Sequence, residues 1–152
     1  DKYLLTDSNV LDLYCGVGTL GLSVAKNEKM VYGIEIVSNA IKNAWDNAKL
    51  NNISNVKYYC GDVSKVISRI ENKIDVIITD PPRSGLDKKT IEVMMKLEPK
   101  EIIYISCDPI TLARDLKLLD GYSLKYITGL DMFSYTNHVE CVSVLYRKDL
   151  EK

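Results

Sequence analysis

The stretch IYISCDPITLARD, residues Ile103–Asp115, predicts a buried strand that leads directly into a helix. β-branched and aromatic residues open it, Asp108 suits a helix N-cap, Pro109 suits the first helical position, and leucines follow at helical spacing. Cys107 is therefore expected at the carboxyl end of the strand, where open α/β sheets bind ligands. The dipole and free N–H groups of the following helix would favour a thiolate there. This segment alone leaves two interpretations of Cys107, a nucleophile or a small buried apolar residue.

A glycine turn follows the first predicted strand, Val10–Cys15. Gly16, Gly18 and Gly21 have the spacing G-x-G-x-x-G and border a predicted helix, Thr19–Lys26. Glycines let the backbone turn tightly and approach a ligand, while a helix N-terminus offers N–H groups. The spacing is weak evidence by itself, because a glycine-rich connection that binds nothing has the same pattern.

The rest of the chain continues to alternate strands with helices, and two final strands have no helix between them. Such an order predicts one three-layer α/β domain, with an antiparallel strand pair at one edge of the sheet. The other predicted strands are Met30–Ile36, Val56–Cys60, Ile74–Thr79, Tyr122–Phe133 and Val139–Arg147, and the other predicted helices are Ser38–Asn51, Val63–Glu71, Asp87–Leu97 and Pro109–Leu119.

Polar side chains follow several of these strands at their carboxyl ends. Glu35, about twenty residues beyond the glycines, suits hydrogen bonds from ribose hydroxyls. Asp62 fits either an adenine amine or a solvated turn. Asp80 opens the loop DPPRSG, in which two prolines restrict the backbone and Arg83 adds a charge. Glu140 begins an otherwise apolar strand, which favours a functional carboxylate. Together with Cys107, these groups are expected at one edge of the sheet.

Length and composition limit the function classes. A chain of 152 residues is expected to form one domain, and its net charge of −1 is not that of a nucleic-acid binder acting by bulk charge. No apolar run approaches the roughly 20 residues of a membrane span, and the first residues lack a signal-peptide pattern, so a cytoplasmic location is expected. The spacing of the cysteines predicts neither a metal site nor a disulfide framework; they are Cys15, Cys60, Cys107 and Cys141.

Four motifs together resemble the catalytic domain of the S-adenosylmethionine-dependent RNA (uracil-5-)-methyltransferases. They are DLYCGVGT (Asp12–Thr19), DPPRSG (Asp80–Gly85), YISCDPITLARD (Tyr104–Asp115) and DMF…HVE (Asp131–Glu140). The resemblance implies a Rossmann-like class I methyltransferase fold with a mostly parallel seven-stranded sheet. It also implies that residues 1–152 are one catalytic domain of a longer enzyme, with the RNA-binding segment outside this chain.

The same resemblance implies a role for each site residue. Cys107 would add to carbon 6 of a uracil in tRNA or rRNA, carbon 5 would take the methyl group of S-adenosylmethionine, and Glu140 would remove the carbon 5 proton. Asp80 and Arg83 would contact the substrate, and no metal is implied. The implied cofactor-binding residues are Tyr14, Gly16, Gly18, Thr19, Glu35, Asp62 and Asp80. Asp108 departs from the family, which often has asparagine at this position, and so does the pair Ser134-Tyr135, where proline-histidine is common.

Three alternatives are consistent with parts of the pattern. A NAD-binding oxidoreductase also uses G-x-G-x-x-G with an acidic residue like Glu35, but it gives no reason for Asp80-Pro81-Pro82. A methyltransferase acting on an exocyclic nitrogen of another base usually has an aromatic residue where Arg83 stands. The third alternative is a cofactor-binding module without activity.

Overall fold

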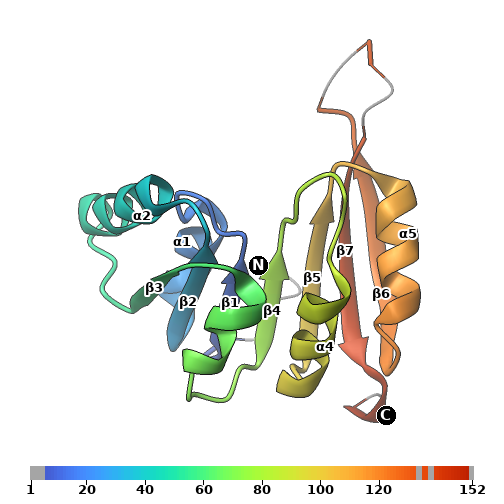
Figure 1. Ribbon diagram of the computed structural model, residues 1–152, viewed down its shortest axis with the longest axis horizontal. Coiled ribbons are helices and arrows are strands. Elements are labelled where there is room, and N and C mark those ends of the chain that lie inside the picture. Colours follow the sequence, from blue (N-terminus) through green and yellow to red (C-terminus); the bar gives the residue numbers. More distant parts are fainter. Residues whose placement is uncertain (1–5, 133–134, 137–138, 151–152) are drawn as a thin grey trace.

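The seven strands form one sheet in the order β3-β2-β1-β4-β5-β7-β6 (Figure 1). This computed structural model describes residues 6–132, 135–136 and 139–150. The pairs among the first five strands are parallel, whereas β7 is antiparallel to both β5 and β6. The mostly parallel sheet with an antiparallel terminal pair is therefore confirmed. The strands are β1 (Asn9–Leu13), β2 (Met30–Glu35), β3 (Val56–Cys60), β4 (Val76–Thr79), β5 (Glu101–Ser106), β6 (Tyr122–Leu130) and β7 (Glu140–Arg147).

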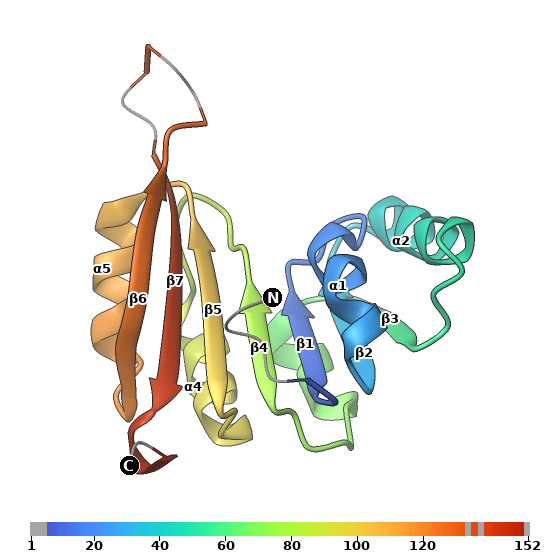
Figure 2. The same cartoon turned by 180° about the vertical axis from the view of Figure 1, so that it is seen from behind.

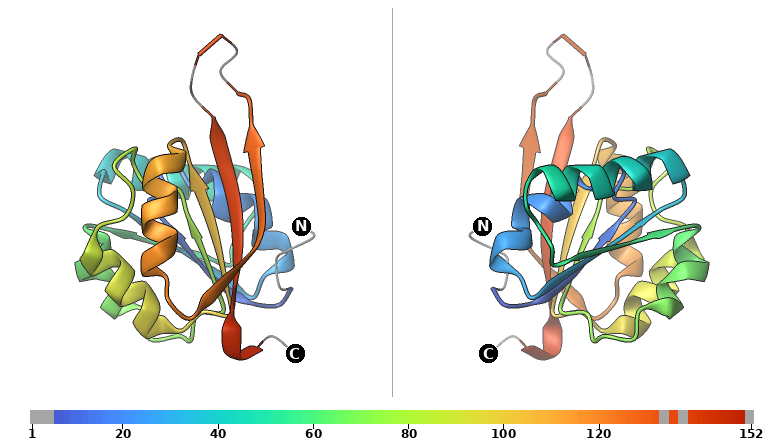
Figure 3. Two further views of the ribbon diagram at one scale, coloured as in Figure 1. Left: turned by 90° about the vertical axis from the view of Figure 1, so that its right-hand side faces the viewer. Right: turned by 90° about the vertical axis from the view of Figure 1, so that its left-hand side faces the viewer.

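Helices cover both faces of the sheet, as the three-layer prediction requires. Figure 3 shows α4 (Lys88–Leu97) and α5 (Pro109–Leu118) on one side of β7 and α1 (Thr19–Val24) on the other. Two apolar cores match this division. Leu112 of α5 and the side chains of α3 (Val63–Val66) and α4 pack on one face, and those of α1 and α2 (Ser38–Leu50) pack on the other.

Several element ends differ from the predicted ones for local reasons. The first strand ends at Leu13, because Tyr14 has a φ of 60° and turns the chain. The helices predicted to reach Lys26 and Glu71 pass early into 3-10 turns, Ala25–Asn27 and Ile67–Arg69. Ser38 does not cap its helix, since Val37 holds the N-cap position without a side-chain bond. Strand β6 ends at Leu130, before the predicted end at Phe133, which itself lies outside the described residues.

The order of the strands brings the predicted site to the carboxyl ends of the parallel strands, at the top of the sheet in Figure 1 and, from behind, in Figure 2. In β5 the predicted strand-to-helix junction is confirmed: Asp108 is the N-cap of α5 and Pro109 is its first residue. None of the described helices has the length and apolar character needed to cross a bilayer.

Candidate active site

The glycine turn after β1 is held tightly against the sheet. Gly18 has a φ of 84° and is the N-cap of α1. A Cβ atom at this position would lie 2.6 Å from the hydroxyl oxygen of Tyr58, so a side chain is excluded both by the backbone and by packing. One turn further on, the amide of Gly21 donates a hydrogen bond of 2.9 Å to Oδ2 of Asp12. The predicted turn is therefore a rigid link between β1 and α1.

Asp12 was not among the predicted site residues, although an acidic residue inside the apolar run VLDLYC is a signal for it. Its side chain is buried, and its Oδ1 atom has no hydrogen-bond partner among the described residues. Burial raises the pKa of Asp12 to about 7; the hydrogen bond from Gly21 opposes the rise and the charge of Asp80 adds to it. Asp12 is therefore a carboxyl that changes charge near neutral pH beneath the glycine turn.

Glu35 connects the glycine turn to the end of β2. Its Oε2 accepts from the amide of Gly16 at 3.2 Å, and its Oε1 accepts from the amide of Val37 at 2.9 Å. An ionised carboxylate has about four acceptor sites, so each oxygen retains one for a ligand. These two bonds fix the orientation of the Glu35 carboxylate at the end of β2.

A cavity of about 220 Å³ lies against Glu35 at the carboxyl edge. Three of the predicted cofactor residues, Tyr14, Glu35 and Asp62, line one part of it. The other part was not predicted, and it comes from the loop after β4 and the start of α4. Its lining residues there are Pro82, Ser84, Gly85, Asp87 and Thr90. The cavity therefore lies between Tyr14 and Glu35, at the ends of β1 and β2, and the loop DPPRSG that follows β4.

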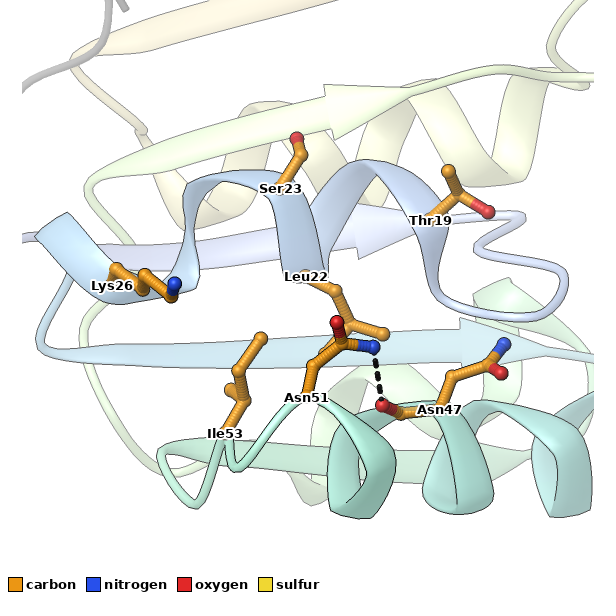
Figure 4. Close-up of a pocket in the computed structure, with 7 residues that line it drawn as sticks. All are labelled: Thr19, Leu22, Ser23, Lys26, Asn47, Asn51 and Ile53. Atoms are coloured by element: carbon orange, nitrogen blue, oxygen red, sulfur yellow. Dashed lines mark hydrogen bonds between the residues drawn. The ribbon is translucent and has the colours of Figure 1, made fainter.

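Thr19 lies on a different cavity from these three residues. It lines an open groove of about 430 Å³ between α1 and the end of α2, together with Ser23, Lys26 and Asn47 (Figure 4). Thr19 begins α1 directly after the glycine turn, and the groove extends from it along α1 towards Lys26. Gly16, Gly18 and Asp80 line neither of the two cavities.

Cys107 directly follows β5, and Glu140 is the first residue of the neighbouring strand β7. Ser106 pairs with Cys141 across these antiparallel strands, so Cys107 and Glu140, each one residue beyond that pair, both lie at the same end of the strand pair. Both residues are partly exposed. Asp80, at the end of β4, lies within electrostatic reach of Glu140: partial burial is the larger cause that raises the pKa of Asp80, and the charge of Glu140 adds to it. The structure thus brings the predicted nucleophile, base and substrate carboxylate to one edge.

The first turn of α5 differs from the expectation of free N–H groups beside Cys107. Oδ1 of Asp108 accepts from the amides of Ile110 and Thr111, at 2.8 and 3.2 Å. Its Oδ2 lies 3.9 Å from Nε of Arg83, whose side chain is largely exposed. The helix N-terminus is therefore capped by a carboxylate, which offsets the helix dipole near Cys107.

Two residues of the predicted motifs fall in parts of the chain that the structure does not describe. His138 and Ser134, which belong to the segment from Asp131 to Glu140, lie outside the described residues. Within residues 6–132, 135–136 and 139–150, no group of three or more histidine, cysteine or acidic side chains could hold a metal ion.

Comparison with known families agrees with this arrangement. A family model described as tRNA (Uracil-5-)-methyltransferase matches residues 62–148, which is more than half of the chain. The chain belongs to the tRNA (uracil-5-)-methyltransferase family. A second model, the methyltransferase small domain, matches residues 2–99 and so covers the glycine turn. The family resemblance carried by the four motifs is thereby confirmed.

Relatives within and near the family are much longer than this chain. An uncharacterized RNA methyltransferase of Clostridium tetani is 48% identical over 142 residues, which are 92% of this chain and 31% of that protein. One from Caldanaerobacter subterraneus is 43% identical over 93% of this chain and 32% of its own length. The crystal structure of the Pyrococcus abyssi tRNA (uracil-54, C5)-methyltransferase with S-adenosyl-L-homocysteine superposes with a TM-score of 0.85 at 36% identity, over 95% of this chain and 35% of that one. The chain thus spans about a third of each.

Proposed function

We propose that this chain is the catalytic domain of an enzyme that forms 5-methyluridine in tRNA or rRNA, with S-adenosylmethionine as the methyl donor. The observation that supports the proposal is the pairing of β5 with β7: its pair Ser106–Cys141 adjoins both Cys107 and Glu140, so both residues lie at the same end of this strand pair. A thiol and a carboxylate at one strand edge are the two groups that methylation of uracil at carbon 5 needs. Neither is required by a dinucleotide-dependent oxidoreductase.

The cavity beside Glu35 fits the adenosine part of the cofactor. Its volume of about 220 Å³ is below the roughly 300 Å³ at which pockets enclose a whole drug-sized ligand, so it suits half of this cofactor. The free acceptor sites of Glu35 match the two ribose hydroxyls, and Asp62 matches the adenine amine. Asp12 in β1 and Asp80 after β4 lie within electrostatic reach of each other, and their negative charge would favour the positive charge of a sulfonium bound at this edge.

In the proposed reaction the thiolate of Cys107 forms a bond to carbon 6 of uracil, and the electron pair of the carbon 5–carbon 6 double bond moves towards carbon 5. S-adenosylmethionine supplies a methyl group on a sulfonium that leaves as a neutral thioether, and carbon 5 takes that methyl. Glu140 then removes the proton on carbon 5. The double bond re-forms, the bond between carbon 6 and sulfur breaks, and Cys107 is regenerated as a thiolate.

Asp80 and Arg83 begin the loop beside this reaction centre, and we assign them to holding the target base. The net charge of −1 makes the chain a poor binder of phosphate backbones in bulk. We therefore assign the selection of the RNA mainly to surfaces outside residues 1–152.

Trapping of the covalent intermediate tests the proposal. The protein is incubated with S-adenosylmethionine and RNA containing 5-fluorouridine, and adducts are measured by mass spectrometry. Fluorine cannot be removed as a proton, so the protein should remain bound to the RNA. Cys107→Ala should abolish the adduct, whereas Cys60→Ala, which removes an exposed cysteine on β3, should leave it unchanged.

A second variant tests the base separately. Glu140→Gln should accumulate an adduct with ordinary uridine RNA, because the carbon 5 proton then stays in place. The longer enzyme that carries this chain, unaltered, is the reference: absence of any adduct in it, over both tRNA and rRNA substrates, would contradict the assignment to uracil carbon 5.

A further inference from the structure

Asp115 is an acidic residue on the side of α5 that faces the core. It lies in α5, one turn after the core residue Leu112, and it is fully buried. Its Oδ2 accepts from the amide of Leu86 at 2.7 Å and from the hydroxyl of Tyr104 at 2.6 Å. A buried carboxylate persists in a protein only when such partners compensate its loss of water. Together with α5 itself, the two partners join three separate segments of the chain.

Arg114 completes the network from the surface side. Its Nε and Nη2 lie 2.8 and 2.7 Å from Oδ1 of Asp115. The same Nη2 atom donates to the carbonyl of Ser84 at 2.8 Å. Gly85 lies between these contacts with a φ of 76°, and a Cβ atom there would be 2.5 Å from both Arg114 Nη2 and Asp115 Oδ2. The loop therefore packs against α5 so closely that only glycine fits.

The network connects the loop to both elements that hold Cys107. Tyr104 lies in β5, three residues before the cysteine, and Asp115 lies in α5, eight residues after it. The loop begins at Asp80, and its residues Pro82, Ser84 and Gly85 form part of the wall of the cavity beside Glu35. A displacement of the loop would thus move the cavity wall relative to the thiol.

We propose that Asp115, with Arg114 and Tyr104, is a positioning residue that sets the placement of the loop Pro81–Leu86 relative to Cys107. This inference rests on the proposed function. The network fixes the position of the cavity wall, and of the loop side chains assigned to the substrate, relative to the thiol of Cys107. None of its three members belongs to the reacting groups, so its effect is transmitted through the loop.

The charge of Asp115 is essential to this role. An asparagine at this position has one acceptor oxygen and two N–H donors, whereas the present contacts require acceptors on both sides. Asp115→Asn therefore leaves donors facing donors, either at Leu86 or at Arg114, and the loop shifts to separate them. A shift of about 1 Å between reacting groups lowers a rate by up to about a hundredfold.

The test compares two tyrosine variants that lose equivalent bonds. Tyr104→Phe removes the buried hydroxyl that donates to Asp115. Tyr122→Phe removes a buried hydroxyl that donates to the carbonyl of Pro99 at 2.7 Å, at the opposite edge of the sheet. Each variant loses one hydrogen bond of a buried hydroxyl, so Tyr122→Phe shows the effect of such a loss away from the loop. Tyr104→Phe also remains available if Asp115→Asn fails to fold.

Three readouts separate positioning from stability. Amide hydrogen exchange at Leu86 should accelerate in Asp115→Asn and Tyr104→Phe but not in Tyr122→Phe. Alkylation of Cys107 by iodoacetamide should keep its rate in all three variants, because β5 and α5 still hold the thiol. Adduct formation with 5-fluorouridine RNA should slow by tenfold or more in the first two variants and stay within twofold in Tyr122→Phe.

Each result has one meaning. Unchanged exchange at Leu86, or equal adduct rates in the Tyr104 and Tyr122 variants, overturns the positioning role while the proposed function stands. Absence of an adduct in the longer enzyme that carries this chain, unaltered, overturns the proposed function, and the positioning role with it.

Discussion

Replacing Asp12 with asparagine should flatten the dependence of stability on pH between about 4 and 7. Asp12 is buried, and its pKa is raised from 3.8 to about 7. In that interval the folded protein keeps a proton that the unfolded chain has already lost, so the folded state binds more protons. The free energy of unfolding is then highest near pH 4, falls as the pH rises, and levels off above pH 7.

The size of the effect follows from the change in pKa. Each pKa unit corresponds to about 1.4 kcal/mol, so the rise from 3.8 to about 7 corresponds to a loss of about 4 kcal/mol between pH 4 and pH 7. Asparagine is neutral throughout, and its side-chain oxygen can still accept from Gly21. Carboxylates with lowered pKa values, such as Asp75 and Asp87, change charge below this interval and do not obscure it.

Urea unfolding followed by circular dichroism at pH 5, 6, 7 and 8 measures the effect. The difference in unfolding free energy between Asp12→Asn and the unaltered protein should grow in favour of the variant from pH 5 to pH 7 and then stay constant. Glu101→Gln is the matched control, because burial also raises the pKa of Glu101 to about 7, far from the glycine turn. Each variant should remove part of the slope. Parallel profiles for Asp12→Asn and the unaltered protein would refute the buried-carboxyl argument.

Three more predictions concern the carboxyl edge. Gly85→Ala should lower the unfolding free energy more than Gly121→Ala in urea titrations. Both glycines have a positive φ, and the backbone strain of an alanine there costs about 1 kcal/mol. Only at Gly85 would the new Cβ also lie 2.5 Å from neighbouring atoms, whereas at Gly121 its nearest neighbour is 3.7 Å away. Asp108→Asn should change stability by less than about 1 kcal/mol, because asparagine caps equally well and the 3.9 Å pair with Arg83 is exposed; a larger loss would show that this pair stabilises the fold. Calorimetry should show that the ratio of the affinity for S-adenosylmethionine to that for S-adenosylhomocysteine rises from pH 6 to pH 8, because Asp12 ionises in this interval. A constant ratio would show that the charge of Asp12 does not act on the sulfonium.

Local sequence was sufficient for the strand-to-helix units and for the edge at which they place their polar residues. The prediction that Asp108 caps a helix beginning at Pro109 depends on neighbouring residues only, and the structure confirms it. The alternation of strands and helices likewise predicted a mostly parallel sheet, since a helix returns the chain for a parallel strand. Element ends were less accurate, because Tyr14 turns the chain through a positive φ that its residue type does not favour.

Tertiary structure decided which of these edge residues meet. Cys107 and Glu140 lie at the same end of one strand pair only because β7 inserts between β5 and β6, and Thr19 lines the groove beside α2 rather than the cavity beside Glu35. The network around Asp115 joins three segments, and a single acidic residue on a helix face does not disclose its partners. Propensity and periodicity act over a few residues, whereas these contacts depend on the order of strands and on packing between segments distant in sequence. The sequence by itself determined the elements and their polar ends, and the packed sheet determined the site.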